Sequence, residues 1–417
     1  MARSAIGVAL VVLMIQAFLV ALLWKRPLQS CKCLSEKHRL GRRSSDGSDA
    51  TSEEISKRFN ETWPSLKRRL CPNMIPNVDM GPKIFQLARD ELQMKSLTAE
   101  ALGSNLDFSG NAHSRAFKFA PGGWSFAPNG VNPGGTNTTV YLRIYKAAND
   151  QIRYWAKETL ADKGILRFFA DSLKEMHATH DTCIVTVMRD PIERFLSAYN
   201  EIEHRLAVEP QRLQDPHPLL YTRYQNGTKA RFIEFIADYV GGPERAGWKW
   251  FQMELEHVWG MSGLLYQLSK HQLRLTDYMA SLKNLSSSWP KFLADTCPGL
   301  PDEAIKVPMK ITSQHDSSND PFGNHAAAKA VWVDQSSNTA RALCALNVLE
   351  YACFDKLDIH NLCKDVYSRA SFVSAVLHQE VASSMPTSSA GNTKIMSGQL
   401  LQGKTSGRVP IIIKGEH

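Results

Sequence analysis

Arg189 and Ser197 flank a strand-to-helix turn, and their side-chain types and spacing suit the binding of an anion. The apolar, β-branched run from Ile184 predicts a buried parallel strand that ends at Arg189. Pro191 suits the first position of the following helix, and Asp190 suits its cap. Ser197 falls two turns into that helix on a polar face. An arginine fork and a hydroxyl therefore converge on one phosphate-like group.

The same helix has one apolar side, formed by residues at i, i+3, i+4 and i+7: Ile192, Phe195, Leu196 and Tyr199. Tyr199 continues this side, so we expect a core residue there rather than a catalytic one. Arg194 shares the polar face with Ser197. Two roles for Arg194 stay open: support for the bound anion, or a salt bridge with Glu193 or Glu201.

A second anion-binding loop is the functional interpretation of the residues after the strand Thr139–Tyr145, although taken alone they are more typical of a turn. Small residues there allow backbone N–H groups to approach a phosphate, and the next helix adds a favourable dipole. The alternative is a plain turn. No Gly-x-x-x-x-Gly-Lys-Ser/Thr occurs in the chain, which argues against an ordinary nucleotide-hydrolysing P-loop. The residues of this loop are Lys146, Ala147, Ala148, Asn149 and Asp150.

The run Arg-Asp-Pro-x-x-Arg-x-x-Ser-x-Tyr resembles the 3′-phosphate-binding motif of sulfotransferases that use 3′-phosphoadenosine-5′-phosphosulfate (PAPS), above all the Golgi carbohydrate sulfotransferases. The resemblance covers residues 136–365 and is most specific at 184–199. It implies that Arg189 and Ser197 bind the 3′-phosphate. It also implies that Lys146 and the amides of its loop bind the 5′-phosphosulfate, with Lys146 neutralising the oxygen that leaves with the nucleotide.

The loop departs from the family pattern at Asn149 and Asp150, where the family usually has Ser or Thr. A carboxylate beside an anion is unfavourable in a partly desolvated site. Two placements of Asp150 stay open. It either points into the site, which weakens cofactor binding, or caps the next helix and faces away.

Sulfuryl transfer requires a base that takes the proton of the attacking hydroxyl, and it requires no metal. His177 and His180 precede the Ile184 strand and are predicted at the opposite edge of the sheet. The resemblance points instead to His257 as the base, although a structural histidine is the alternative. Glu254 and Glu256 are lesser candidates, since a carboxylate base needs its pKa raised by burial.

Strands alternating with helices predict an α/β fold with three α/β/α layers and a central parallel sheet, in which the Thr139 and Ile184 strands are joined by a crossover. The Gly/Pro/Asn-rich residues 121–135 are predicted to be loop. Residues 277–282 resemble the next core strand of the family. Helices are predicted over Lys83–Leu102, Gln151–Leu160, Ile165–Met176, Arg231–Tyr239, Trp248–Leu268, Ala340–Tyr351 and Val366–Val381.

Composition, together with what the resemblance implies about function and orientation, divides the chain into five expected parts. They are a cytosolic tip over 1–4, a transmembrane signal anchor over 5–24, a flexible basic stem over 25–80, a lumenal sulfotransferase domain over 81–367, and a tail over 368–417 that is first helical and then disordered.

The run Ala5–Trp24 is apolar except for Gln16 and is long enough to span a bilayer. Its bulky end favours an uncleaved anchor over a signal peptide. The positive-inside rule alone would place the body in the cytosol. Four Asn-x-Ser/Thr sequons and the resemblance favour the opposite orientation, a single-pass type II protein of the Golgi membrane with a lumenal body. The sequons are at Asn60, Asn137, Asn226 and Asn284.

The net charge of +8 comes mostly from the stem, since residues 25–70 hold 12 Lys and Arg against 6 Asp and Glu. The charge therefore gives no argument for a nucleic-acid partner. The eight cysteines lack the spacing of a zinc site. In an oxidising lumen some would form disulfides, among 105 possible full pairings. Cys183 opens a buried strand and is predicted to be a free core thiol.

Together these features predict an enzyme that moves a sulfuryl group from PAPS to a hydroxyl of a glycan or glycoprotein, with no metal. Two rivals stay open. One is a non-catalytic, glycan-binding lumenal relative, which Asp150 favours. The other is a nucleotide-dependent kinase of the same fold, which the missing glycine-lysine loop disfavours.

Overall fold

The structure is a computed structural model that describes residues 51–94, 123–127, 138–156, 166–170, 178–208, 225–241, 257–258, 260–297, 300 and 320–378. All of these residues belong to one compact unit, Thr51–His417. The predicted cytosolic tip, the anchor and the residues after 378 lie outside the described part. None of the described helices is both long and apolar enough to cross a bilayer.

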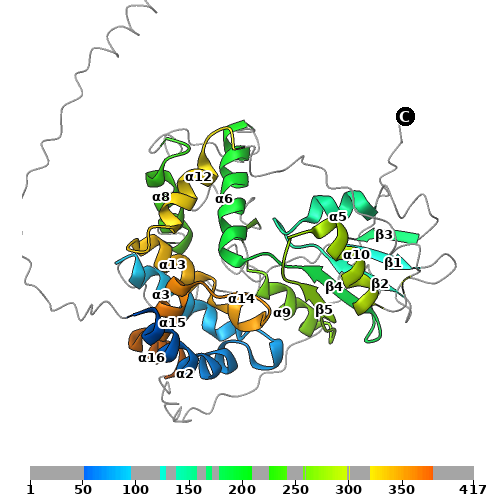
Figure 1. Ribbon diagram of the computed structural model, residues 1–417, viewed down its shortest axis with the longest axis horizontal. Helices are drawn as coiled ribbons and strands as arrows, with labels where there is room; N and C mark the ends of the chain where they lie inside the picture. The colour runs from blue at the N-terminus through cyan, green and yellow to red at the C-terminus, as the bar shows by residue number, and fades with distance from the viewer. Residues whose placement is uncertain are drawn as a thin grey trace, which may run out of the picture. The chain divides into compact units, whose positions relative to one another are not determined.

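The described strands form one five-stranded sheet in the order β3-β1-β2-β4-β5 (Figure 1). Strands β2, β4 and β5 are parallel, and β1 runs antiparallel to both β2 and β3. The predicted α/β class with a central parallel sheet is thus confirmed. The strands are β1 Gly123–Ala127, β2 Thr139–Leu142, β3 Leu166–Ala170, β4 Cys183–Val187 and β5 Asp277–Met279.

Two of these strands correct the sequence prediction. Strand β1 lies inside the glycine- and proline-rich stretch that was expected to be loop. Strand β3 lies where a helix was expected over Ile165–Met176. The run Leu-Arg-Phe-Phe-Ala of β3 is short and apolar, and such runs do not distinguish a strand from a helix by periodicity. Pairing with β1 decides in favour of the strand.

The helices that the structure describes cover both faces of this sheet. They are α2 Ser52–Leu70, α3 Gly81–Glu91, α5 Asn149–Trp155, α6 Pro191–Val208, α8 Lys229–Gly241, α9 Ser262–Lys270, α10 Leu285–Thr296, α12 Asn324–Trp332, α13 Asn338–Leu346, α14 Val348–Cys353, α15 Asn361–Ser368 and α16 Ala370–Leu377, with short 3-10 turns at Pro72–Met74 and Val78–Met80.

Successive side chains of β2 and β4 enter two separate hydrophobic cores. Tyr141 and Val185 pack on one face with α5 and α10, where the Tyr141 ring meets Trp289 edge-on at 5.5 Å. Leu142 and Ile184 join the larger core on the other face, which includes α6 and α8. Burial on both faces explains the continuous apolar runs of these strands. The result is the predicted three-layer arrangement.

Several predicted helices are present with different bounds. Helix α3 ends at Glu91, short of the predicted Leu102. The helix expected over Ala340–Tyr351 is divided into α13 and α14 by Asn347, whose backbone leaves the helical region at φ −100° and ψ 10°. Similarly, Arg369 divides α15 from α16 with an extended backbone.

Helix α2 overturns the prediction that residues 25–80 are a flexible stem. Its apolar side buries Phe59, Leu66 and Leu70, and it packs against α15 and α14. A disulfide joins Cys71, just after this helix, to Cys353 at the end of α14. Residues 52–80 therefore belong to the folded unit.

Cys183 is also not the free thiol that was expected. It forms a disulfide with Cys297, at the end of α10, and a third disulfide joins Cys344 to Cys363. Both partners of the Cys183 bridge flank the core between the sheet and α10. The bridge ties the first residue of β4 to that helix.

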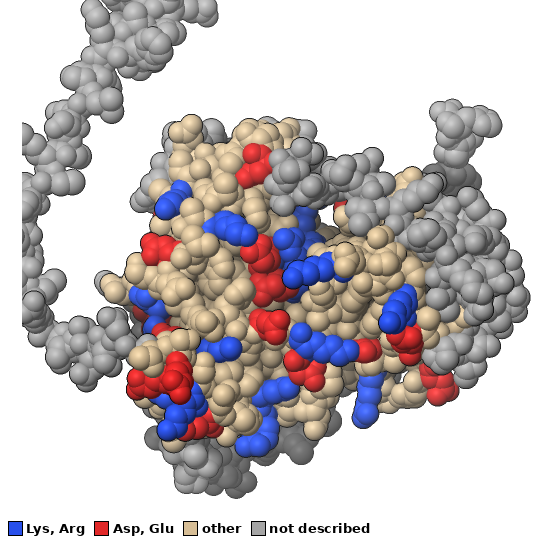
Figure 2. Space-filling view, viewed as in Figure 1, with Lys and Arg blue, Asp and Glu red and all other residues tan. Residues whose placement is uncertain are grey.

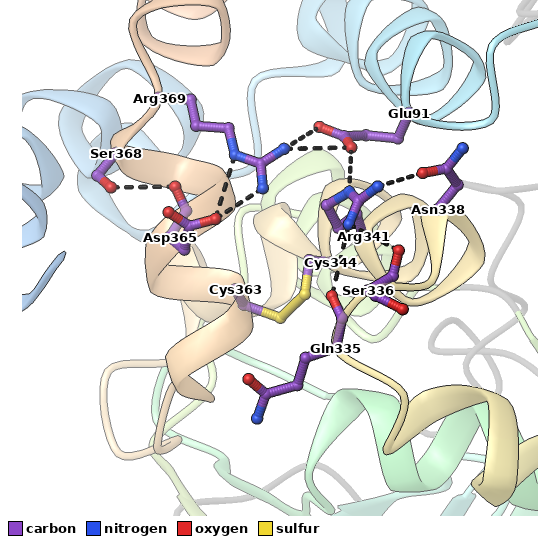
Figure 3. A network of polar contacts seen from close by, with 10 residues as sticks. All are labelled: Glu91, Gln335, Ser336, Asn338, Arg341, Cys344, Cys363, Asp365, Ser368 and Arg369. Carbon is purple, nitrogen blue, oxygen red and sulfur yellow. Dashed lines mark hydrogen bonds and ion pairs between the residues drawn. A yellow bond between two sulfur atoms is a disulfide. The ribbon is translucent and has the colours of Figure 1, made fainter. Parts of the chain in front are cut away.

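A network of charged side chains holds the N-terminal helix α3 against the C-terminal helices (Figure 3). Glu91 accepts hydrogen bonds from Arg341 Nε (3.0 Å) and from Arg369 Nη1 (3.1 Å). Arg369 Nη2 also donates to Asp365 Oδ2 of α15 (2.6 Å). The Cys344–Cys363 disulfide lies beside this network, so α3, α13 and α15 are joined at one place.

Candidate functional site

Lys146 and Arg189 both follow the carboxyl ends of neighbouring parallel strands. Strands β2 and β4 pair with Leu142 opposite Thr186, and the chain continues from them to Lys146 and to Arg189 respectively. Because the two strands are parallel, both cations leave the same edge of the sheet. Ligands of open α/β sheets bind at this edge.

The loop that carries Lys146 has an uncommon backbone. Lys146 and Ala148 have positive φ values of 62° and 60° although neither is glycine. Left-handed residues turn consecutive N–H groups towards one side, which is the geometry of an anion-binding nest. Non-glycine residues held in this region are found preferentially at functional sites. The backbone here is thus consistent with the predicted anion-binding loop.

Asn149 and Asp150 begin helix α5. The Tyr141 hydroxyl donates to Asn149 Oδ1 (2.8 Å), which fixes the amide of Asn149 against the sheet. Asp150 is exposed and belongs to the first turn of α5, whose cap residue is Ala148 with no side-chain capping bond. Of the two placements left open for Asp150, capping of this helix is therefore not observed. A carboxylate in the first turn is still favoured by the helix dipole.

Lys146 is paired with an acidic residue that the sequence did not indicate. Its Nζ lies 2.8 Å from Glu201 Oε2 of α6, and the two side chains are 19% and 20% exposed. Glu201 Oε1 also accepts from Arg205 Nε (2.7 Å). Burial alone would raise the pKa of Glu201, but the Lys146 ammonium and the Arg205 guanidinium outweigh it and lower the pKa to about 2. This carboxylate is ionised at any physiological pH.

The start of α6 agrees with its sequence prediction. Asp190 Oδ1 accepts from the Glu193 backbone N–H (2.8 Å), and Pro191 is the first helical residue. Arg189 Nη2 lies 3.7 Å from Glu193 Oε2, and the other oxygen of Glu193 is 3.2 Å from Lys329 Nζ. Ser197 is half-buried, one helical turn beyond Glu193. Tyr199 is fully buried against Phe232 and Phe235, as expected for a core residue.

Charged groups of both signs gather along this part of α6. Figure 2 shows lysine and arginine atoms beside acidic ones in the middle of the view, between α6 and the sheet. The side chains of Lys146 and Arg189 are partly exposed here, at 19% and 25%.

Arg194 contacts the backbone of the segment that carries His257, and its support of a bound anion stays a prediction. It is 1% exposed, and its Nη1 and Nη2 donate to the backbone carbonyls of His257 (2.9 Å) and Val258 (3.4 Å). Arg194 thus fastens the 257–258 segment to α6. It supports the site by positioning that segment.

His257 lies next to the Lys146 loop. Its ring is 3% exposed and packs on Tyr145, the residue before Lys146, with ring centroids 4.8 Å apart. Arg143 approaches the same tyrosine and donates to its hydroxyl (3.0 Å). His180 is exposed in the turn before β4, at the opposite edge. His177, Glu254 and Glu256 lie outside the described residues.

Three contacts in this region were missed by sequence reasoning: those of Arg189 with Glu193, of Lys146 with Glu201 and of Asp190 with His360. Glu193 stands four residues after Arg189, and that spacing is a recognisable signal for an ion pair. Glu201 is distant from Lys146 in sequence, so no local pattern connects them. The same holds for His360, whose Nε2 lies 3.1 Å from Asp190 Oδ2.

A family model described as "Sulfotransferase family" matches residues 137–356. The chain belongs to the sulfotransferase family. The resemblance to the family of the Golgi carbohydrate sulfotransferases, predicted from residues 184–199, is thereby confirmed. The match begins just before β2 and ends after β5, so it includes both strand ends and both cations. No curated protein and no solved structure matches the chain significantly.

Membership of the sulfotransferase family implies PAPS as the sulfuryl donor. The residues present fit such a nucleotide, because a lysine with a left-handed loop and an arginine with a hydroxyl stand at one sheet edge. Among the described residues there is no group of three His, Cys, Asp or Glu side chains that could hold a metal ion. The three disulfides of the sulfotransferase indicate a domain that folds in the secretory pathway.

Proposed function

We propose that the chain transfers a sulfuryl group from PAPS to a hydroxyl of a glycan or glycoprotein. The observation that carries this proposal is the placement of Lys146 and Arg189 at the ends of adjacent parallel strands. Arg189 and Ser197 bind the 3′-phosphate, with the guanidinium as a two-pronged donor. Lys146 and the backbone amides from Ala147 to Asp150 bind the 5′-phosphosulfate.

The reaction is an in-line displacement at sulfur. The acceptor hydroxyl oxygen forms a bond to sulfur, the bond from sulfur to the 5′-phosphate oxygen breaks, and the electron pair leaves with adenosine 3′,5′-bisphosphate. Lys146 stabilises the negative charge that develops on the leaving oxygen. His257 accepts the proton of the hydroxyl. Its position against Tyr145, beside the Lys146 loop, supports this role.

The glycan acceptor and the membrane orientation are further parts of the proposal. They rest on the motif at 184–199, on the disulfides, and on sequons whose Asn60 and Asn284 are exposed. In the proposed arrangement residues 5–24 anchor a type II protein in the Golgi membrane and its body is lumenal. Digestion of the full chain from cells with an N-glycosidase should then shift its mobility.

One observation favours a non-catalytic relative as the second candidate. Lys146 already forms an ion pair with Glu201, and the carboxylate would oppose the binding of an anion to the lysine. A relative without activity would bind neither adenosine 3′,5′-bisphosphate nor ATP. A kinase of this fold would prefer ATP.

Calorimetry of the full chain with adenosine 3′,5′-bisphosphate and with ATP separates these functions. We expect binding of the bisphosphate only. The Arg189→Ala variant should lose this binding because it lacks the guanidinium, whereas His257→Ala should lower turnover at least about 100-fold and keep binding nearly intact.

Turnover is measured with labelled PAPS against a panel of glycans, which also identifies the acceptor. Loss of binding and turnover together in His257→Ala would assign His257 a structural role. His257→Asn, which keeps most of the side-chain volume beside Tyr145, is the matched variant for that comparison.

A further inference from the structure

Lys146, the residue assigned to the phosphosulfate, already forms an ion pair with a carboxylate of the same chain. Glu201 Oε2 is 2.8 Å from its ammonium, and both groups are about four-fifths buried. An incoming phosphosulfate needs the same ammonium. The donor and Glu201 therefore compete for Lys146.

Glu201 lies on the same side of α6 as Ser197, which is assigned to the 3′-phosphate. Glu193, Ser197, Glu201 and Arg205 follow one another at intervals of four residues along α6, and all four are half-buried. Residues four apart share one face of a helix. The two glutamates, separated by about 12 Å of helix rise, thus contact the two cations from either side of Ser197.

Arg205 gives Glu201 a second partner. Its Nε donates to Glu201 Oε1 (2.7 Å), while Lys146 contacts the other oxygen. When an anion takes Lys146, Glu201 keeps one charged hydrogen bond on its own helix, one turn away. Displacement from Lys146 therefore leaves the carboxylate partnered rather than buried and unpaired, which would cost much more.

We propose that Glu201 is a positioning residue that occupies the place of the phosphosulfate on Lys146 until the donor binds. This inference rests on the proposed function and names the step by which the donor enters. Glu201 holds the lysine in its binding position in the free enzyme. It also weakens the affinity for the nucleotide, which assists release of the bisphosphate product.

The test is nucleotide affinity in full-length Glu201→Gln. Glutamine keeps the shape of the side chain and can still accept the hydrogen bond from Arg205 Nε, but it removes the negative charge that competes for Lys146. Adenosine 3′,5′-bisphosphate should bind about 5- to 20-fold more tightly than in the wild type, as expected for the loss of a partly buried ion pair. In the Lys146→Ala background the same substitution should change the affinity less than about two-fold.

Asp277→Asn is the matched control. It also removes a carboxylate from a lysine ion pair, that of Asp277 Oδ1 with Lys356 Nζ (2.5 Å), but at the start of β5, away from the strand ends of the site. Its nucleotide affinity should equal that of the wild type. A purely structural Glu201 would give weaker or unchanged binding in Glu201→Gln, and either result overturns the inference while the proposed function stands.

A second readout needs no nucleotide. Amine-directed labelling of Lys146, measured by peptide mass spectrometry, should be several-fold faster in Glu201→Gln than in the wild type, since the ion pair shields the amine. Equal labelling rates would overturn the inference even if no variant binds the bisphosphate. Failure of every variant to bind the bisphosphate, with labelling faster as expected, would instead overturn the proposed function, and with it the role of Glu201 in donor entry, and would leave only the ion pair of Lys146 and Glu201 confirmed.

Discussion

Asp190 uses its two carboxylate oxygens for different elements. Oδ1 caps α6, and Oδ2 accepts from the Tyr351 hydroxyl (3.0 Å) and from His360 Nε2 (3.1 Å). Burial alone would raise the pKa of Asp190, but the hydrogen bonds from His360, the Glu193 amide and Tyr351 lower it. The hydrogen bond to Asp190 raises the pKa of His360, against the opposing effect of burial, with Glu193 and Asp358 adding to the rise.

We predict a pH-dependent stability difference between the wild type and His360→Asn. The pKa of His360 is higher in the folded state than its unfolded value of about 6.5, so its stabilisation is fully present below about pH 6.5 and is lost as pH rises through the folded pKa. Asp190 stays ionised over this range because its pKa is lowered. The difference should be below about 1 kcal/mol, since His360 is 40% exposed.

Melting temperatures of both proteins between about pH 5.5 and 9 measure this difference. It should be largest at the acid end and disappear at the alkaline end. Substitution of Asp190 by Asn provides the control, since the pH-dependent effect of His360→Asn should then be smaller, with only Glu193 and Asp358 left to raise the pKa of His360. A constant difference across the range would contradict the assignment.

The contacts of individual residues could be predicted from the sequence only where the partners lie close together along the chain. Arg189, Asp190, Pro191 and Ser197 lie within nine residues, and the local helix pattern located the cap correctly but put the buried Arg194 on the polar face with Ser197. Arg194 was misassigned because its partners are carbonyls of a distant segment, and backbone carbonyls leave no mark in a sequence. The Lys146–Glu201 pair was missed because only the β2-to-α6 packing brings these residues together.

At the scale of elements, the start of α9 depends on a buried carboxylate from α14. Glu350 Oε2 accepts from the Ser262 backbone N–H (2.9 Å), and Oε1 accepts from the Ser262 hydroxyl (2.8 Å). Burial raises the pKa of Glu350, although nearby Arg194 and the Ser262 bonds oppose the rise. Gly260 leaves room for this carboxylate, because a Cβ there would lie 2.4 Å from Oε1.

We therefore expect Gly260→Ala to lower the free energy of unfolding by about 1–3 kcal/mol, the usual range for overpacking a buried site. Ser262→Ala is the comparison, because it removes one hydrogen bond to Glu350 and adds no atom. The free energy of unfolding of Ser262→Ala should fall less, by about 1 kcal/mol. Urea unfolding of both variants gives the two values. A loss from Gly260→Ala below that from Ser262→Ala would show that Glu350 moves aside.

Helices and strands were predicted correctly where their apolar residues follow a regular pattern. The prediction failed where strand pairing or contacts with distant helices determine the structure. Helix α6 and the parallel strands had clear patterns. Strand β1 follows glycines that indicated loop, and its partner β3 matched a helix equally well. Helix α2 is polar over most of its surface, and only Phe59, Leu66 and Leu70 are buried. Its composition therefore resembled a stem.

For the whole molecule, the helices at the N-terminal end of the described residues pack against the helices at their C-terminal end. Helices α2 and α3 precede residue 137, where the family match begins, and pack against α15 and α13. The Cys71–Cys353 disulfide and the Glu91 network fix this arrangement. The sulfotransferase region therefore carries an N-terminal extension that is part of its core, and shortening the chain at residue 80 would remove part of that core.

The Cys71–Cys353 bridge should be the most stabilising of the described disulfides that join helices. Its partners are 282 residues apart, whereas Cys344 and Cys363 are 19 apart. Because a longer closed loop restricts the unfolded chain more, replacing both cysteines of the first pair by serine should lower stability by about 2 kcal/mol more than the same change in the second pair. Urea unfolding and secreted yield of the two double variants measure this. Equal losses would mean that α2 holds its place through packing on α14, α15 and α16, without help from the covalent link.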